Sequence, residues 1–219
     1  PILTGVHFVL SDNKDLKTVA TDSHRMSQKV ITLEKNGDNF DVVIPSRSLR
    51  EFTSVFSDDI ETVEVFFANN QILFRSEHIS FYTRLLEGNY PDTDRLIPTE
   101  FNTEATFNVA NLRFAMERAR LLSNATQNGT VKLEFKNGVV SSHVHSPEVG
   151  RVNEEIDTSA VSGEDLSISF NPTYLIEALK AIDSEQVVIR FISSVRPFTL
   201  VPEGNEQGFI QLITPVRTN

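Results

Sequence analysis

The segment VATDSHRM, residues 19–26, gathers residue types that can do chemistry. An aspartate, a serine, a histidine and an arginine stand at consecutive positions from Asp22 to Arg25. Carboxylate and imidazole groups bind metal ions and act as general acids and bases, and a serine hydroxyl can act as a nucleophile. The first hypothesis is therefore a hydrolytic or metal site that uses Asp22 and His24.

Such a site needs further ligands, or a nucleophile with an oriented base, from elsewhere in the chain. The candidates are His143 and His145, which would share one strand face, and Glu148. Nothing in the sequence places them near residue 24, and the chain has no HExxH, P-loop or GxSxG motif. A hairpin turn at Asp22-Ser23 is the alternative, because Asp and Ser are common turn formers.

The bulk composition is typical of a soluble globular protein of one large domain or two ordinary ones, with 219 residues, 39% of them hydrophobic and 23% charged. The absence of cysteine excludes disulfides and thiolate chemistry and fits a reducing cytoplasm, which is the expected location. No apolar run approaches the ~20 residues of a membrane span, and the start PILTGVHFVL is not a signal peptide. Because this start lacks an initiator methionine, we expect a piece of a longer protein.

Most of the chain alternates apolar and polar residues with the period of a β-strand. Residues 62–67 alternate in this way, turn residues follow at 68–70, and the alternation resumes at 72–74. Three segments have helical spacing instead, and the predicted helices are residues 46–56, 109–123 and 172–182. Asn171 is expected to cap the third helix, with Pro172 in its first turn.

An internal repeat organises these elements: a shift of about 125 residues aligns the first part of the chain with the second. Leu49 in its predicted helix falls on Leu175, and the strand at 6–8 falls near residues 131–133. A colinear match of a helix and several strands is improbable by chance. The counterpart of the strand and helix at 105–123 would lie before residue 1, so we expect the first copy to lack both.

The charge is unevenly distributed along the chain. The net charge of −10 argues against tight nucleic-acid binding over the whole surface, because neutralising phosphates needs clustered Lys and Arg. The three predicted helices nevertheless carry a net +3, which leaves −13 for the remainder. Their charged residues are Arg47, Arg50, Glu51, Arg113, Glu117, Arg118, Arg120, Glu177 and Lys180. Either the helices have ordinary solvated faces, or they line a surface that faces a polyanion without reading its sequence.

Four motifs, in order, resemble those of one protein family. VATDSHRM is similar to its ATDGHRL-type motif, and EGNYPDTDRLIP at 87–98 is similar to its G-x-[FY]-P-D-x-x-R-[VL]-[LI]-P. FNPTYL at 170–175 is similar to its F-N-x-x-Y-L, and LITPVR at 212–217 to its x-x-x-P-[MV]-R tail. The family is the bacterial DNA polymerase III β subunit, the sliding clamp, and the resemblance covers the whole chain.

The resemblance implies an α+β fold of repeated DNA-clamp domains, each with two helices packed on antiparallel sheets and with the helices toward the interior of a ring. Residues 1–93 would be an incomplete middle clamp domain, and residues 94–219 the C-terminal clamp domain. The implied function is that of a processivity factor around duplex DNA, with no catalytic site, cofactor or metal of its own. The implied partners are duplex DNA, the polymerase III alpha subunit, clamp-loader subunits and other proteins with clamp-binding motifs. The full-length protein would be a homodimer, without a membrane association.

In the family, the matching residues line a pocket for a short linear peptide. By position, this pocket comprises Leu3, Thr21, Ser23, His24, Arg25, Met26, Pro91, Arg95, Leu96, Asn171, Tyr174, Ile213, Thr214, Pro215, Val216 and Arg217. Each Leu or Phe of a ligand that the apolar members bury would contribute roughly 1.5–3 kcal/mol, which suits exchangeable, micromolar binding. The polar members could bind peptide carbonyls, a Gln side chain or a terminal carboxylate. Core packing is the alternative for the apolar members, above all for Leu3 and Leu96.

The resemblance also implies that Arg47 faces DNA, at the place where the family has a basic residue on a pore helix. Arg50, Arg113 and Arg120 are further candidates for this DNA-facing set, whereas Arg118 is expected to pair with nearby acids. The sequence departs from the family pattern at Ser23, where a glycine is usual, and the turn is less tight if its backbone needs a positive φ. The favoured hypothesis is a sliding clamp. The alternatives are a metal- or His-dependent hydrolase that uses Asp22 and His24, and a generic two-domain peptide-binding module.

Overall fold

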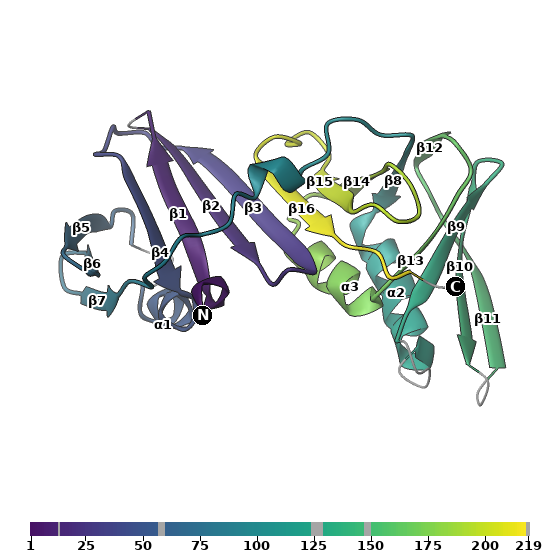
Figure 1. The fold of residues 1–219 in the computed structure, drawn as a ribbon, viewed down its shortest axis with the longest axis horizontal. Helices are drawn as coiled ribbons and strands as arrows, with labels where there is room; N and C mark the ends of the chain where they lie inside the picture. Colours follow the sequence, from purple (N-terminus) through teal and green to yellow (C-terminus); the bar gives the residue numbers. More distant parts are fainter. Residues whose placement is uncertain (13, 57–59, 124–128, 147–149, 218–219) are drawn as a thin grey trace. The chain divides into compact units, whose positions relative to one another are not determined.

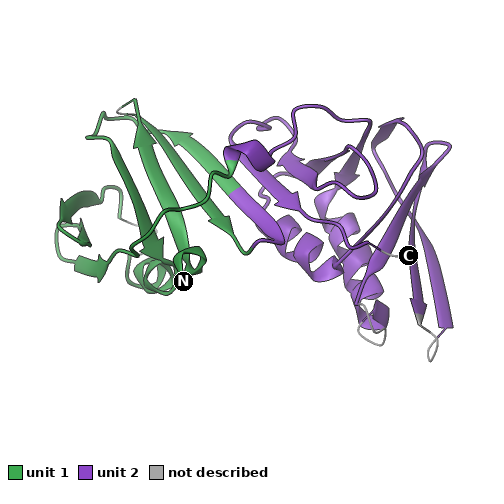
Figure 2. Ribbon diagram, viewed as in Figure 1, with its two compact units in different colours: residues 1–22, 28–93 green, residues 23–27, 94–219 purple. Residues whose placement is uncertain are grey.

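The computed structural model describes residues 1–12, 14–56, 60–123, 129–146 and 150–217. The chain divides into two compact units, which Figure 2 colours separately. Unit 1 consists of Pro1–Asp22 and Gln28–Thr93, and unit 2 consists of Ser23–Ser27 and Asp94–Asn219. Most of the Asp22–Arg25 segment therefore belongs to unit 2. Within the described ranges, no helix has both the length and the apolar character needed to cross a membrane.

Unit 1 combines strands with one α-helix among its described residues. Its elements are η1 (Ile2–Thr4), β1 (Gly5–Ser11), β2 (Asp15–Thr21), β3 (Arg25–Thr32), β4 (Phe40–Pro45), α1 (Ser46–Val55), β5 (Glu64–Ala68), β6 (Gln71–Arg75) and β7 (Ser80–Arg84). The strands form two sheets, with the orders β3-β2-β1-β4 and β5-β6-β7 (Figure 1). The first residues of β3 belong to unit 2, where β16 is the neighbouring strand.

Unit 2 has two α-helices among its described residues and more strands. Its elements are η2 (Asp94–Leu96), β8 (Thr103–Asn108), α2 (Val109–Ser123), β9 (Val131–Lys136), β10 (Val139–Ser146), β11 (Gly150–Ile156), β12 (Ala160–Gly163), β13 (Leu166–Phe170), α3 (Pro172–Lys180), β14 (Gln186–Phe191), β15 (Phe198–Pro202) and β16 (Phe209–Ile213). Its two sheets have the orders β12-β8-β14-β15-β16 and β11-β10-β9-β13. Helices and antiparallel sheets together make an α+β fold, as the resemblance implies.

The strand pairings of the two units repeat. Strand β1 pairs with β2 and β4, and β9 pairs in the same way with β10 and β13. Helix α1 follows β4 as α3 follows β13, and the order β5-β6-β7 matches β14-β15-β16. The internal repeat predicted from the sequence is therefore present in the structure. Strand β8 and helix α2 have no counterpart among the described residues of unit 1.

The helices begin at the predicted residues and end close to the predicted ones. Helix α2 has the predicted bounds, α1 ends one residue early at Val55, and α3 ends at Lys180, two residues before the predicted end. Asn171 caps α3 as expected, because its Oδ1 accepts a hydrogen bond from the Thr173 backbone N–H at 2.9 Å. The end of α3 is earlier because its last turn tightens: the N–H of Ala181 donates to the carbonyl of Ala178 at 3.1 Å.

Each unit has its own hydrophobic core. In unit 2, one cluster joins residues of α2, α3 and both sheets, and Leu112, Met116 and Leu175 are fully buried in it. The core of unit 1 is smaller and lies between α1 and the two sheets, where Phe56 stacks on Phe52 with ring centroids 4.4 Å apart. The larger core gives unit 2 the firmer support for side chains on its surface.

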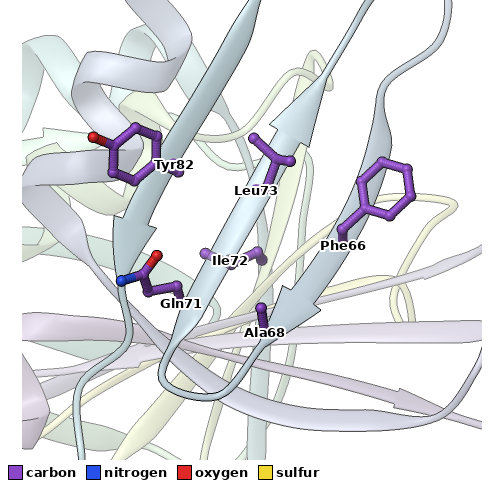
Figure 3. Close-up of a pocket in the computed structure, with 6 residues that line it drawn as sticks. All are labelled: Phe66, Ala68, Gln71, Ile72, Leu73 and Tyr82. Atoms are coloured by element: carbon purple, nitrogen blue, oxygen red, sulfur yellow. The ribbon is translucent and has the colours of Figure 1, made fainter.

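Strand β5 differs from the half-buried strand that its alternation predicts, because all five of its residues are exposed. Its counterpart β14 lies between β8 and β15, whereas β5 pairs with β6 alone among the described strands. Across β5, β6 and β7, the neighbouring residues Phe66, Leu73 and Tyr82 line a hollow of about 310 Å³ (Figure 3). Strand register thus follows the sequence pattern, but burial depends on the neighbouring elements.

Candidate functional site: an aromatic and basic cluster on unit 2

The segment VATDSHRM, residues 19–26, contains the connection between two strands. Strand β2 ends at Thr21 and β3 begins at Arg25, so Asp22, Ser23 and His24 make the connection. The backbone of Ser23 has a φ of +75°, in the left-handed region that glycine adopts without strain. The turn expected here is therefore present, and a serine occupies a position whose backbone favours glycine.

The side chains of His24 and Arg25 both contact the aromatic ring of Tyr174 on α3. The rings of His24 and Tyr174 stack with centroids 6.3 Å apart and an interplanar angle of 16°. The guanidinium carbon of Arg25 lies 4.7 Å from the centroid of the Tyr174 ring, at the distance of a cation–π contact. The structure therefore brings together His24, Arg25 and Tyr174, which lie about 150 residues apart along the chain in unit 2.

The same face of α3 supplies a carboxylate to this cluster. Glu177 forms an ion pair with Arg25 and lies three residues after Tyr174, so both side chains project from one side of the helix. The side chains of Arg25 and Glu177 are 35% and 52% exposed, which leaves the pair accessible to a ligand. Glu177 was not among the pocket residues that the sequence predicts. Its spacing from Tyr174 is a signal, but the motif that carries the resemblance ends at Leu175.

The backbone after β16 is fixed on both sides by hydrogen bonds. The N–H of Thr214 donates to the carbonyl of His24 at 2.9 Å, and the N–H of Val216 donates to the carbonyl of Ser169 at 2.7 Å. These bonds hold residues 214–216 along the turn and the end of β13. The two sequence motifs at residues 19–26 and 212–217 are thus adjacent in the structure.

The apolar residues of the predicted pocket fall into two groups. Met26 and Ile213 are 3% and 1% exposed, so the protein itself already buries them and they support the site from within. Leu96 in η2 and Val216 are 50% and 38% exposed and are available to an apolar ligand group. Core packing therefore describes Met26 and Ile213, whereas it does not describe Leu96.

The other predicted pocket residues occupy several elements. In unit 2, Asn171 caps α3, Arg95 lies exposed in η2, and Pro215 and Arg217 follow β16, with Arg217 exposed. Leu3 in η1, Thr21 at the end of β2 and the exposed Pro91 belong to unit 1. The predicted pocket residues that belong to unit 2 therefore form a cluster whose geometry lies within one unit.

The described residues of the hydrolase hypothesis do not assemble into a metal site. His143 lies on β10, where its Nε2 is 2.8 Å from Ser141 Oγ and 3.2 Å from a Glu134 oxygen, and its Nδ1 is 2.8 Å from Asn153 Oδ1. Glu148 lies outside the described residues. Within the described parts of the chain, no three His, Cys, Asp or Glu side chains are grouped so that they could hold a metal ion. His24 instead stacks on an aromatic ring.

The predicted DNA-facing arginines lie on α1 and α2. On α1, Arg47 pairs with Glu51 at 3.1 Å while its side chain stays 86% exposed, and Arg50 is exposed. On α2, Arg113 and Arg120 are partly buried. Arg113 also helps to line a hollow of about 250 Å³ between the start of α2 and the end of α3, together with Asn108, Val109, Ala110, Leu179, Lys180, Ile182, Ser184 and Glu185.

The expectation that Arg118 pairs with nearby acids is confirmed. Its Nε donates to Glu154 on β11 at 3.3 Å, and a second bond joins its terminal nitrogen to the same carboxylate. The hydrogen bond to Glu154 raises the pKa of Arg118 above its ordinary value. Arg118 therefore ties α2 to a neighbouring strand.

Two units that repeat the same strand pairings, each with α-helical structure packed on antiparallel sheets, define a protein of repeated clamp-type α+β domains. Residues 1–92 match the family model of the DNA polymerase III beta subunit, central domain, and residues 94–217 match that of its C-terminal domain. The chain belongs to the DNA polymerase III beta subunit family, the sliding clamps. The resemblance drawn from four sequence motifs is therefore confirmed.

The relatives support this membership over the whole chain. A beta sliding clamp of Streptococcus pneumoniae is 80% identical over all 219 residues, which correspond to 58% of that protein. A crystal structure of the DNA polymerase III beta chain of the same species has a TM-score of 0.98 at 80% identity and is covered to 58%. A structure of the beta subunit from Streptococcus pyogenes has a TM-score of 0.96 at 71% identity and is covered to 59%. The chain thus spans less than two thirds of the relatives it matches.

Proposed function

We propose that this chain is part of a sliding clamp, a ring that encircles duplex DNA, gives a replicative polymerase its processivity and has no catalytic site of its own. The observation that carries the proposal is the match to the beta-subunit family along both units, over residues 1–92 and 94–217. On this basis residues 1–93 are a middle clamp domain and residues 94–219 a C-terminal clamp domain. The full-length protein would be a homodimer in the cytoplasm.

The proposed partners are duplex DNA, the polymerase III alpha subunit, clamp-loader subunits and other proteins that carry clamp-binding peptides. The DNA-facing arginines Arg47, Arg50, Arg113 and Arg120 would contact phosphates, which positions a protein without reading sequence. Such contacts weaken steeply with salt. Loose contact suits a ring that has to slide, because its retention on DNA comes from closure around the duplex.

The proposed peptide site is the cluster of His24, Arg25, Tyr174 and Val216 on unit 2. The ring of Tyr174 and the exposed part of Val216 offer apolar surface, and the imidazole and guanidinium groups offer hydrogen-bond donors. Burying two ligand side chains contributes roughly 1.5–3 kcal/mol each, and together with a few hydrogen bonds this suits binding no tighter than micromolar. A short peptide bound in this way exchanges readily between partner proteins.

The test is a fluorescence-polarisation titration of a labelled QLxLF-type peptide against the chain. We expect saturable binding in the micromolar range that Tyr174→Ala weakens roughly tenfold or more, because it removes the ring under two other site residues. Tyr82→Ala is the matched control, since Tyr82 is a 72% exposed tyrosine on β7 of unit 1. Equal affinity of both variants for the peptide would refute a site at Tyr174.

A further inference from the structure

The charge of Arg25 is balanced inside the cluster before any ligand arrives. The Glu177 carboxylate forms an ion pair with the guanidinium, and the Tyr174 ring lies 4.7 Å from its centre. Because Tyr174 and Glu177 project from the same side of α3, one helix supplies both the ring and the anion. Two of the contacts of Arg25 are thus to a single helix.

We propose that Glu177 is a positioning and specificity-determining residue of the peptide site. It holds Arg25 against Tyr174 and neutralises its charge, so that the site selects neutral over acidic peptide ends. This inference rests on the proposed peptide-docking function of the same cluster. For the polar pocket residues, the sequence leaves three ligand groups open: peptide carbonyls, a Gln side chain or a terminal carboxylate. For Arg25, the proposal favours the two neutral groups over the carboxylate.

The physical argument is a competition between two anions for one cation. An unengaged arginine presents several N–H donors in a fork that fits a carboxylate, and it attracts acidic ligands strongly. With Glu177 in place, a ligand carboxylate has to share or displace that partner and also meets its negative charge. An amide or carbonyl ligand carries no charge and is not repelled by the Glu177 carboxylate.

The expected size of the effect follows from the exposure of the pair. Both side chains are about one third to one half exposed, so water and salt screen their field. For unit charges several Å apart in such surroundings, removing one changes the affinity for a charged ligand by about three- to tenfold. The effect is therefore measurable as a ratio of dissociation constants, and it should shrink as salt is added.

The test compares two peptides of the same QLxLF-type sequence, one ending in a free carboxylate and the other in an amide, each labelled at its N-terminus. The 219-residue chain is titrated in four forms: wild type, Glu177→Gln, Arg25→Gln and the double variant. We expect Glu177→Gln to shift the ratio of dissociation constants about three- to tenfold toward the carboxylate peptide. Arg25→Gln should shift it the other way, and the double variant should return it to the wild-type value.

Two further variants separate charge from shape. Glu155→Gln on β11, in the other sheet of unit 2, makes the same change in net charge and should leave the ratio unchanged. Glu177→Asp keeps the charge and should keep the ratio even where overall affinity falls. Arg217, exposed after β16, is present in every variant, so its contribution cancels in the comparison.

The outcomes distinguish this inference from the proposal it rests on. A Glu177→Gln ratio equal to that of wild type overturns the specificity role, provided that wild type binds both peptides. A ratio that shifts but does not respond to salt also overturns it, because a charge effect must be screened. If wild type binds neither peptide, the peptide-docking function itself fails.

Discussion

Asn171 combines a structural role with a place in the proposed peptide site, and the two can be separated by substitution. Its Oδ1 accepts a hydrogen bond from the Thr173 backbone N–H at 2.9 Å and so caps α3. Replacing an N-cap Asn by Ala typically costs about 1 kcal/mol, within a range of roughly 0.5–2. We therefore expect Asn171→Ala to lower the free energy of unfolding of unit 2 by about 1 kcal/mol. Peptide affinity should fall as well, since α3 carries Tyr174 and Glu177.

Asn171→Asp keeps a capping oxygen and places a negative charge at the positive end of the helix dipole. It should therefore retain the wild-type stability or exceed it by a few tenths of a kcal/mol. It removes the amide donor, so a loss of affinity for the peptide with an amide end, which carries no terminal charge for the new carboxylate to repel, reports a direct contact of Asn171 with the ligand. The pair of variants thus assigns the capping and the ligand-binding roles to different atoms of one side chain.

The assay is urea denaturation followed by circular dichroism, with the peptide titration run on the same preparations. The matched control is Asn108→Ala, because Asn108 Oδ1 accepts a hydrogen bond from the Asn111 backbone N–H at 3.1 Å at the start of α2. This variant should lose stability to a similar extent without losing peptide affinity. The reasoning is refuted if Asn171→Ala is as stable as wild type, or if Asn171→Asp is destabilised as much as Asn171→Ala.

Three further predictions concern the turn, the core and a tyrosine. Ser23→Gly should raise the free energy of unfolding by about 0.5–1 kcal/mol, because glycine adopts the φ of +75° without strain; unchanged stability in urea denaturation would contradict this. Leu175→Ala should cost about 2–5 kcal/mol in the same assay because Leu175 is fully buried, whereas Leu121→Ala, at 72% exposure, should cost less than about 0.5. Burial raises the pKa of the Tyr90 phenol above its ordinary value of 10.0. The neutral phenol therefore contributes stability that is fully present below about pH 10 and is lost as the pH rises through the higher pKa of the folded state. The difference in ultraviolet absorbance titration between wild type and Tyr90→Phe should reveal the raised pKa, and a midpoint at or below 10 would contradict it.

The elements of the fold could be predicted from the sequence because they depend on local patterns. Apolar spacing gave the bounds of α2, and the Asn171-Pro172 pair gave the start of α3. The repeat was visible because the elements from β1 to β7 in unit 1 follow the same order as most of the elements from β9 to β16 in unit 2. Burial was harder to predict: the alternation that leads into β5 predicts a half-buried strand, yet all five residues of β5 are exposed, because burial depends on which elements lie beside a strand.

The candidate site could be predicted in part, for a related reason. The family resemblance supplied His24, Arg25 and Tyr174, and the structure brings these three together. It did not supply Glu177, because the ion pair to Arg25 depends on how the turn approaches α3 and not on any local motif. The resemblance also does not distinguish a residue that lines a pocket from one that supports it, and Met26, at 3% exposure, can only support it.

The repeat shows that the site depends on particular side chains and not on the fold. With Leu49 aligned on Leu175, Ser48 takes the place of Tyr174, and Pro45 takes that of the capping Asn171. In unit 1, Ser48 Oγ lies 2.8 Å from Thr83 Oγ1, and α1 begins without a side-chain cap.

Glu51 takes the place of Glu177 under the same alignment, but it pairs with Arg47 on its own helix at 3.1 Å. Helix α1 thus keeps the carboxylate of the cluster while it lacks the aromatic ring. The same supersecondary structure therefore carries the proposed peptide site in unit 2 and a self-paired, basic helix face in unit 1. Introducing a tyrosine at Ser48 would add only the ring, because the carboxylate of Glu51 remains engaged within α1.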